Sequence, residues 1–138
     1  MEQDTQTAIS VLNKESFTCV VCKGTLTHTA TERGVKPLLT WLDNGIDLTG
    51  FCAADRVVGR ATAFLYCLLD VKEVYARVMS QPAREVLESH GITAYTDKVV
   101  PGIINRRGTG PCPFEAAVMD ISEAEEALLA IRAKLASM

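Results

Sequence analysis

The chain has 138 residues, of which 48% are hydrophobic and 22% are charged, and its formal net charge is -3. This length suits a single folded domain over residues 1–138, and the apolar content is too high for an intrinsically disordered chain. The negative net charge argues against general nucleic-acid binding.

The apolar runs and the cysteines argue against a membrane or secreted protein. No apolar run approaches the roughly 20 residues that a transmembrane helix needs, so no membrane partner is expected. The first residues, MEQDTQTAISVLNKE, contain neither a basic start nor a long apolar segment, so no signal peptide is expected. The five cysteines are odd in number and irregularly spaced, which fits thiols in a reducing compartment. These features predict a cytoplasmic protein.

The first part of the chain predicts a helix, a hairpin and a second helix. Residues 4–15 favour a short helix with Asp4 as its N-cap. Residues 16–30 form two β-branched runs around a Lys-Gly turn, which is typical of a β-hairpin. In GVKPLLTWLDNG the apolar residues repeat at helical spacing, Pro37 suits the first turn, and Asn44-Gly45 ends the helix.

The remainder alternates between strands and helices. TGFCAAD predicts a buried strand, and VVGRATAFLYCLL is apolar nearly all round, as expected of a buried central helix. A strand in EVYARVMS, a helix in QPAREVLESHG and a strand in ITAYTDK follow. PFEAAVMD predicts a short helix, and the last helix lies in SEAEEALLAIRAKLA, with Ser122 and Glu125 at capping-box spacing.

A hairpin followed by strand-helix alternation predicts an α/β fold, with three layers (α/β/α) and a mixed sheet. Right-handed crossovers bring the carboxyl ends of the parallel strands and several helix N-termini to one edge of the sheet. Ligands prefer that edge in open α/β sheets, so a functional site is expected there.

The cysteines and histidines give little support for a metal or redox site. Cys19 and Cys22 form a CxxC, but within a strand residues i and i+3 point to opposite faces, and no second CxxC exists. Cys52 and Cys67 lie in apolar stretches, as expected of small core residues. The two histidines are isolated. The sequence therefore predicts neither a bound metal nor a cofactor.

Cations lie near two predicted helix starts at the expected ligand edge. Arg33 and Lys36 open the helix after the hairpin, where the helix dipole disfavours positive charge. Asp55 and Arg56 follow the buried strand, and Asp55 suits an N-cap of the next helix. Two interpretations stay open at each place: a solvated or capped first turn, or a site at which cations and backbone N–H groups hold an anion.

The segment NRRGTGPCPFE, from Asn105 to Glu115, is the strongest candidate. Its Gly-Thr-Gly is suited to pointing successive N–H groups at one anion, and Arg106 suits bidentate binding of phosphate or carboxylate. Cys112 lies near the N-cap of a short helix, where a thiol is expected to have a lowered pKa. A purely structural role is the competing interpretation, with Glu115 as a cap of backbone N–H groups.

Three phrases, RGVKPLLTWL, AADRVVGRA and INRRGTGPCPFEAAV, resemble a small, mostly uncharacterised prokaryotic family placed in the cytidine deaminase-like superfamily. The resemblance covers about residues 9–118 and implies a mixed five-stranded sheet flanked by helices. The zinc deaminases of that superfamily carry a His-x-Glu or Cys-x-Glu and a Pro-Cys-x-x-Cys at two helix starts. Here residues 33–36 and 55–59 occupy those places without zinc ligands. Zinc-dependent deamination is therefore not expected.

Taken together, the pattern predicts a non-zinc deaminase-like domain that binds a small anionic molecule, such as a phosphorylated, carboxylated or nucleotide-like compound. The predicted ligand-binding residues are Arg33, Lys36, Asp55, Arg56, Asn105, Arg106, Thr109 and Cys112. Two alternatives stay open: an enzyme of unknown reaction that uses Cys112 or Asp55 and Glu115, and a protein-interaction module. Self-association into a homo-oligomer is also compatible with the sequence.

Overall fold

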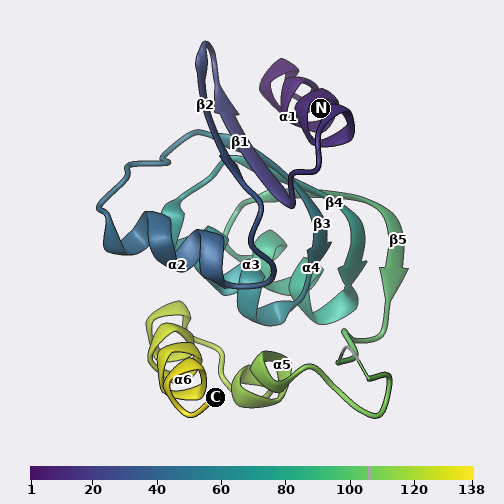
Figure 1. The fold of residues 1–138 in the computed structure, drawn as a ribbon, viewed down its shortest axis with the longest axis vertical. Coiled ribbons are helices and arrows are strands. Elements are labelled where there is room, and N and C mark those ends of the chain that lie inside the picture. The colour runs from purple at the N-terminus through teal and green to yellow at the C-terminus, as the bar shows by residue number, and fades with distance from the viewer. Residues whose placement is uncertain (106) are drawn as a thin grey trace.

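In the computed structural model, which describes residues 1–105 and 107–138, a five-stranded sheet carries helices on both faces (Figure 1). The strands are β1 (Cys19–Lys23), β2 (Leu26–Ala30), β3 (Cys52–Val58), β4 (Glu73–Ser80) and β5 (Thr93–Val100). The helices are α1 (Gln3–Lys14), α2 (Lys36–Asp43), α3 (Arg60–Leu69), α4 (Gln81–Ser89), α5 (Pro113–Val118) and α6 (Ala124–Ala136). The predicted element order and the α/β class with a mixed sheet are confirmed.

The strand order β2-β1-β3-β4-β5 brings four strand ends to one edge of the sheet. Strand β1 is antiparallel to both of its neighbours, and β3, β4 and β5 are mutually parallel. Consequently β2, β3, β4 and β5 all point the same way, and the segments that follow them leave from the same edge. This edge is called the carboxyl edge below.

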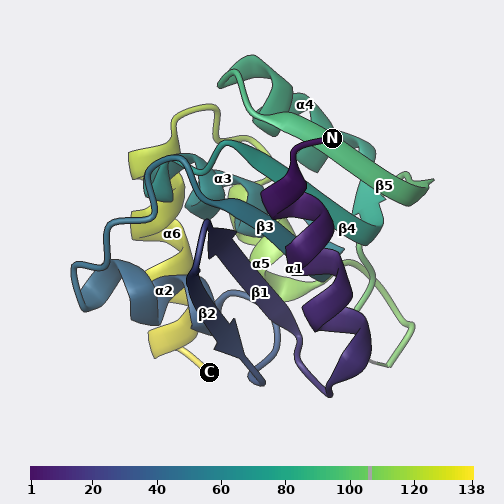
Figure 2. The same cartoon turned by 90° about the horizontal axis from the view of Figure 1, so that it is seen from above.

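The two faces of the sheet are covered unequally (Figures 1 and 2). Helix α1 lies on one face, where Ala8 and Leu12 pack with Val20, Cys22 and Ala54 in a small apolar cluster. The larger core lies on the other face, under α2, α3 and α4, and α5 and α6 pack against α3. Cys19 belongs to the large core and Cys22 to the small one, so the predicted opposite orientation of the two thiols is confirmed.

Helix α3 is the centre of the large core. Its residues Phe64, Leu65 and Tyr66 are no more than 1% exposed, as expected of the predicted all-round apolar helix. Burial on every side requires neighbours on every side, and α2, α4, α5 and α6 supply them. Among the residues that the structure describes, no helix has both the length and the apolar character to span a membrane.

The predicted caps of the first and last helices are wrong. Helix α1 starts after Glu2 rather than Asp4, and the Asp4 carboxylate instead accepts a hydrogen bond from the backbone N–H of Gly24 in the hairpin turn. Helix α6 starts after Glu123, with no side-chain cap, so the predicted capping box at Ser122 does not form. In the first case a tertiary contact takes the side chain that local pattern assigned to the cap.

Strand β3 starts and ends about three residues later than the sequence pattern indicates. It continues through Asp55 to Val58, and α3 starts at Arg60, with Gly59 as its N-cap. The prediction that Asp55 caps this helix is therefore wrong. A charged residue inside a central strand is unexpected from sequence, and its buried hydrogen bonds, described below, explain why the strand tolerates it.

Candidate functional site

The candidate site lies at the carboxyl edge, where β1 joins the ends of β2 and β3. Cys19 of β1 is in register with Ala30 of β2 on one side and with Asp55 of β3 on the other. Thr18, just before β1, strengthens this junction, because its carbonyl accepts a hydrogen bond from the N–H of Arg56 at 3.3 Å. Its hydroxyl lies within hydrogen-bonding distance of two carbonyl oxygens, that of Ala30 at 3.1 Å and that of Glu32 at 2.5 Å. Thr18 thus connects the backbone at Arg56 to the backbone at Glu32, directly before Arg33.

Asp55 is 7% exposed and makes hydrogen bonds through both carboxylate oxygens. Oδ2 accepts from the Tyr66 hydroxyl of α3 at 2.7 Å, and Oδ1 accepts from the N–H of Arg56 at 2.8 Å. The Tyr66 hydroxyl also lies 3.0 Å from the Cys19 thiol, so three buried polar groups form one network. Their mutual hydrogen bonds offset part of the unfavourable desolvation of a buried carboxylate.

Burial dominates the proton equilibria of this network. It raises the pKa of Asp55 to about 6, although hydrogen bonds from Tyr66 and the backbone N–H groups of Arg56 and Val57 lower that pKa. Burial also raises the pKa values of the Tyr66 hydroxyl and the Cys19 thiol well above their usual values, and the neighbouring Asp55 carboxylate adds to both shifts. The phenol and thiol therefore stay neutral near pH 7, whereas Asp55 titrates close to it.

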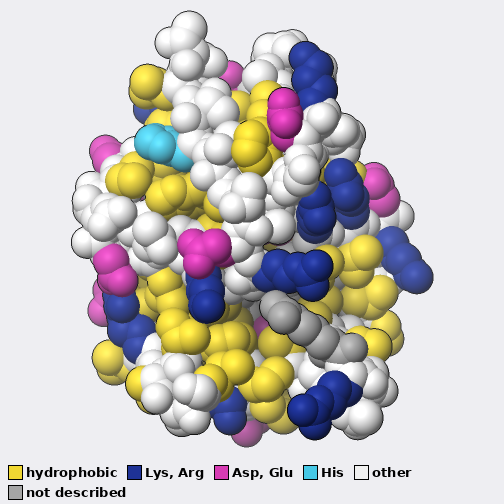
Figure 3. All heavy atoms as spheres, viewed as in Figure 1, with side chains coloured by type: hydrophobic (Ala, Val, Ile, Leu, Met, Phe, Trp, Pro, Cys, Tyr) yellow, Lys and Arg dark blue, Asp and Glu magenta, His cyan; other side chains and the backbone are white. Residues whose placement is uncertain are grey.

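Arg56 contains a polar atom that the folded chain leaves unsatisfied. Its Nε is buried and has no hydrogen-bond partner, and it is the one such side-chain atom in the described part of the chain. Buried N–H groups of arginine almost always find an acceptor in folded proteins. Figure 3 shows Lys and Arg side chains gathered over the carboxyl halves of β3, β4 and β5. The Nε of Arg56 thus has hydrogen-bonding capacity left for an acceptor.

Arg33 and Lys36 lie at the start of α2, as predicted. Lys36 is the first residue of the helix, the N-cap Val35 provides no side-chain cap, and both cations are exposed. No carboxylate among residues 1–105 and 107–138 lies within ion-pair distance of either cation. Pro37 in the first turn is confirmed. The start of α2 therefore carries two exposed cations that take part in no ion pair within the described part of the chain.

The glycine-containing loop after β5 uses its polar groups internally. The Asn105 amide donates to the Thr109 hydroxyl at 3.1 Å, and its Oδ1 accepts from the N–H of Thr109 at 3.1 Å. The N–H of Gly108 donates to the carbonyl of Asn105. The backbone N–H groups of Gly108 and Thr109 therefore already donate to Asn105. The prediction that they form part of an anion cradle is wrong for these two residues. Arg106, also predicted to bind the ligand, lies outside the described residues.

Glu115 caps a helix, but not its own. Its Oε1 accepts from the N–H of Arg60 at 2.6 Å, and its Oε2 accepts from the N–H of Ala61 at 2.8 Å, so it caps α3. In return, the Arg60 guanidinium donates to the carbonyls of Val118 and Ile121 after α5. The predicted capping role of Glu115 is therefore confirmed, but the capped helix is α3 and not α5. The N-terminus of α3 is consequently filled by an internal carboxylate.

Cys112 is the N-cap residue of α5, as predicted, and is half-buried. Its backbone N–H donates to the carbonyl of Ile103, which closes the loop onto its own start. The thiol makes no capping hydrogen bond. The predicted ligand-binding and nucleophilic roles of Cys112 stay predictions.

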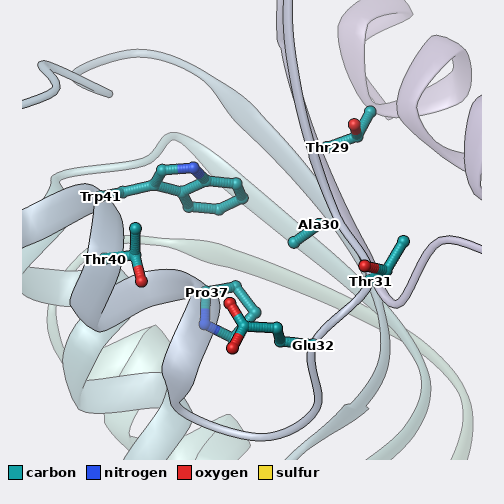
Figure 4. A pocket seen from close by; sticks show the side chains of 7 residues that line it. All are labelled: Thr29, Ala30, Thr31, Glu32, Pro37, Thr40 and Trp41. Carbon is teal, nitrogen blue, oxygen red and sulfur yellow. The ribbon is translucent and has the colours of Figure 1, made fainter.

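Two shallow cavities flank the start of α2. The first, of about 330 Å³, is lined by Thr29, Ala30, Thr31, Glu32, Pro37, Thr40 and Trp41 (Figure 4). The second, of about 530 Å³, is lined by Glu32, Lys36, Leu39, Thr40, Asp43, Arg132, Leu135 and Ala136. They share Glu32 and Thr40, so they lie next to each other along α2. Of the predicted ligand residues that the structure describes, Lys36 lines the second cavity, and none lines the first.

Sequence reasoning missed the residues that connect these features. Thr18 joins the two strand ends, Tyr66 holds Asp55, and the Thr40 side of α2 borders the cavities. The spacing of Thr40 from Lys36, one helical turn, was the available signal for Thr40. No local signal identifies Thr18 or Tyr66, since their partners lie in other elements. Among the described residues, no group of three or more His, Cys, Asp or Glu side chains is arranged to hold a metal ion.

Comparison with known proteins places the chain beside one described family. A family model described as "TM1506: Domain of unknown function (DUF1893)" matches residues 7–135. The crystal structure of a DUF1893 family protein, TM1506 from Thermotoga maritima, is similar to this chain with a TM-score of 0.85 and 24% sequence identity. The match covers 100% of this chain and 92% of that one, and at this identity it establishes the fold alone. None of the curated proteins compared with the chain gives a significant match.

Proposed function

The chain belongs to the DUF1893 family, a domain of unknown function, and from that premise we propose that it binds a small anionic ligand at the carboxyl edge. The ligand is phosphorylated or carboxylated, and it lies between the start of α2 and the end of β3. The observation that carries this proposal is the buried Nε of Arg56, which has no acceptor in the described part of the chain. An oxygen of a bound anion would satisfy it.

The charges and dipoles around Arg56 favour the same class of ligand. Arg33 and Lys36 add two cations, and the first turn of α2 adds the positive end of a helix dipole. Thr18 ties the Arg56 backbone to the segment that carries Arg33, which keeps the two parts of the site together. The start of α3 is not available to the ligand, because Glu115 already binds there. The proposed anion therefore belongs to α2 and β3.

We also propose that the domain is a member of the cytidine deaminase-like superfamily that has lost the zinc-dependent reaction. In support, the sheet is mixed and five-stranded with helices on both faces, as the resemblance implies. At the two places where zinc ligands are expected, the chain has residues 33–36 and 55–59. Cations in place of zinc ligands fit an anion-binding role for the same region.

Binding of simple anions tests the proposal. We expect inorganic phosphate and AMP to raise the melting temperature of the protein at constant ionic strength, and isothermal titration calorimetry to give a saturable isotherm. Arg56→Lys removes the planar, bidentate donor while keeping the charge, and should weaken binding by about tenfold. Arg33→Ala should act in the same direction. Arg84→Ala, on α4 in an exposed pair with Glu88, is the matched control.

Two outcomes would contradict the proposal. One is the absence of stabilisation by any phosphorylated or carboxylated compound. The other is an equal response of the Arg33, Arg56 and Arg84 variants, because a nonspecific ionic effect does not distinguish positions on the surface.

A further inference from the structure

The first cavity beside α2 contains chemistry that an anion does not need. Its lining combines the threonine side chains of Thr29, Thr31 and Thr40 with the Glu32 carboxylate and the apolar surfaces of Pro37 and Trp41. No Lys or Arg lines it. A carboxylate wall repels anions and accepts hydrogen bonds from neutral donors, so this cavity suits an uncharged part of a ligand.

The polar groups of this cavity are available for a ligand. Thr31, Glu32 and Thr40 are exposed, and within the described part of the chain no intramolecular hydrogen bond involves their side chains. No ion pair occupies the Glu32 carboxylate there either. Figure 4 shows Glu32 beside the Pro37 ring, with Thr40 and Trp41 on the same wall and the end of β2 opposite. Hydroxyl and carboxylate groups thus converge on a depression with an apolar wall.

This combination matches the surface of a sugar. A sugar ring presents several hydroxyl groups that both donate and accept, and a carboxylate with threonine hydroxyls pairs with such groups in complementary fashion. Its C–H face packs against apolar side chains such as proline and tryptophan. A volume of about 330 Å³ lies at the lower end of the range of small-ligand sites, which fits one sugar ring.

Two cations of the proposed anion site, Arg33 and Lys36, are chain neighbours of residues that line the first cavity. Glu32 directly precedes Arg33, and Lys36 directly precedes Pro37. Residues of the cavity and of the proposed anion site therefore alternate within the short segment 32–37. The second cavity, which contains Lys36, shares Glu32 and Thr40 with the first. We propose that the ligand is a phosphorylated sugar, with its phosphate at Arg33, Lys36 and Arg56 and its ring hydroxyls at Thr31, Glu32 and Thr40. This inference rests on the proposed anion site.

Calorimetric titration of the full chain with three probes tests it: inorganic phosphate, D-ribose 5-phosphate and D-ribose. We expect D-ribose 5-phosphate to bind at least about tenfold more tightly than inorganic phosphate, as two or three added hydrogen bonds would give. Glu32→Gln and Thr40→Val should each reduce the ratio of the two dissociation constants severalfold. Thr93→Val, an exposed threonine at the start of β5, is the matched control and should leave the ratio unchanged.

The outcomes separate this inference from the proposal on which it rests. If inorganic phosphate binds and D-ribose 5-phosphate binds no more tightly, the sugar subsite is wrong and the anion site stands. If the ratio is high but the Glu32 and Thr40 variants leave it unchanged, the sugar lies elsewhere and the inference is overturned. If neither phosphate compound binds, or D-ribose binds as tightly as its phosphate, the anion site fails and the inference fails with it. Circular dichroism of each variant checks that the fold is retained.

Discussion

The carboxylate of Glu115 accepts a hydrogen bond from the backbone N–H of Arg60 at 2.6 Å, across a sequence separation of 55 residues. A second bond, from Ala61, completes a cap that α3 does not provide for itself, since its N-cap is Gly59. The segment after β5 is thereby fastened to the central helix of the core. This side chain and the return contacts of the Arg60 guanidinium help to hold the segment at the carboxyl edge.

Removal of the Glu115 carboxylate should destabilise the protein. We expect Glu115→Ala to lower the free energy of unfolding by about 1–2 kcal/mol, because two N–H groups of α3 lose their acceptor and the helix dipole loses a compensating charge. Urea denaturation followed by circular dichroism measures this loss. Asp120→Ala, which removes an exposed carboxylate close to the same segment, should change the free energy little. Equal effects of the two substitutions would contradict the capping role.

A methyl group at Gly59 should displace the same cap. A Cβ built there lies 2.6 Å from Cδ of Glu115 and 2.9 Å from Cγ1 of Ile103, which is too close for unshifted side chains. We expect Gly59→Ala to destabilise the protein by about 1–3 kcal/mol. Gly102→Ala, where a Cβ meets nothing within 4 Å, is the matched control.

The two changes should also be coupled. Because Gly59→Ala already moves Glu115 away from α3, adding Glu115→Ala should cause much less than the sum of the single losses in a double-mutant cycle. Additive losses would show that Gly59 matters for a reason other than the Glu115 carboxylate.

Asp55 should make stability fall as the pH rises from about 4 to 7. Its pKa of about 6 in the folded protein is above the usual 3.8, so ionisation is disfavoured in the folded state. The resulting loss is absent below the unfolded pKa, grows between the two pKa values and is complete above pH 6, where it amounts to about 3 kcal/mol. The difference in unfolding free energy between wild type and Asp55→Asn should show this pH dependence.

Asp43 is a control of opposite sign. The hydrogen bond from Arg132 lowers the pKa of this exposed carboxyl, so its ionisation stabilises the folded state and its contribution is lost as the pH falls. The difference between wild type and Asp43→Asn should therefore run in the opposite direction with pH. Two difference curves of the same sign would contradict the assignment of Asp55.

The Tyr66 hydroxyl should hold the pKa of Asp55 down. In Tyr66→Phe the Asp55 carboxylate loses its donor at 2.7 Å, so its pKa should rise above about 6 and the unfolding free energy should fall by about 1–2 kcal/mol. A ¹³C NMR titration of the side-chain carboxyl groups measures the pKa directly. Tyr75→Phe, which removes the donor to Asp97, is the matched control and should leave Asp55 unaffected. An unchanged Asp55 titration in Tyr66→Phe would contradict the network.

The affinity of the proposed anion site should depend on the same proton. Protonation of Asp55 removes a negative charge next to Arg56, so anion binding should be tighter at pH 5 than at pH 7.5. Sulfate is the appropriate probe because its charge is constant over this range. We expect the pH dependence to disappear in Asp55→Asn. A sulfate affinity that does not change with pH in the wild type would contradict the coupling.

Local sequence patterns predict the helices and strands and the edge of the sheet at which they meet. Helical spacing in residues 35–42, the hairpin around Gly24 and the apolar run of α3 are local patterns, and each is confirmed. The placement of Arg33, Lys36 and Arg56 near strand ends also followed, because a mixed sheet with right-handed crossovers leaves few other arrangements. Cys112 as the N-cap of α5 was likewise predicted from its following proline.

The partner of each polar side chain depends instead on how distant segments pack. A short polar residue after an apolar run predicts a helix cap at Asp55, yet Asp55 lies within the strand and accepts a hydrogen bond from Tyr66, eleven residues later. Glu115 caps a helix 55 residues away, and Asp4 bonds to the hairpin at Gly24. The spacing of apolar residues along the chain predicts which face of a helix or strand is buried, because the burial of a side chain depends on many neighbours at once. A hydrogen bond depends on one atom at about 3 Å, and that distance is set only when distant segments pack.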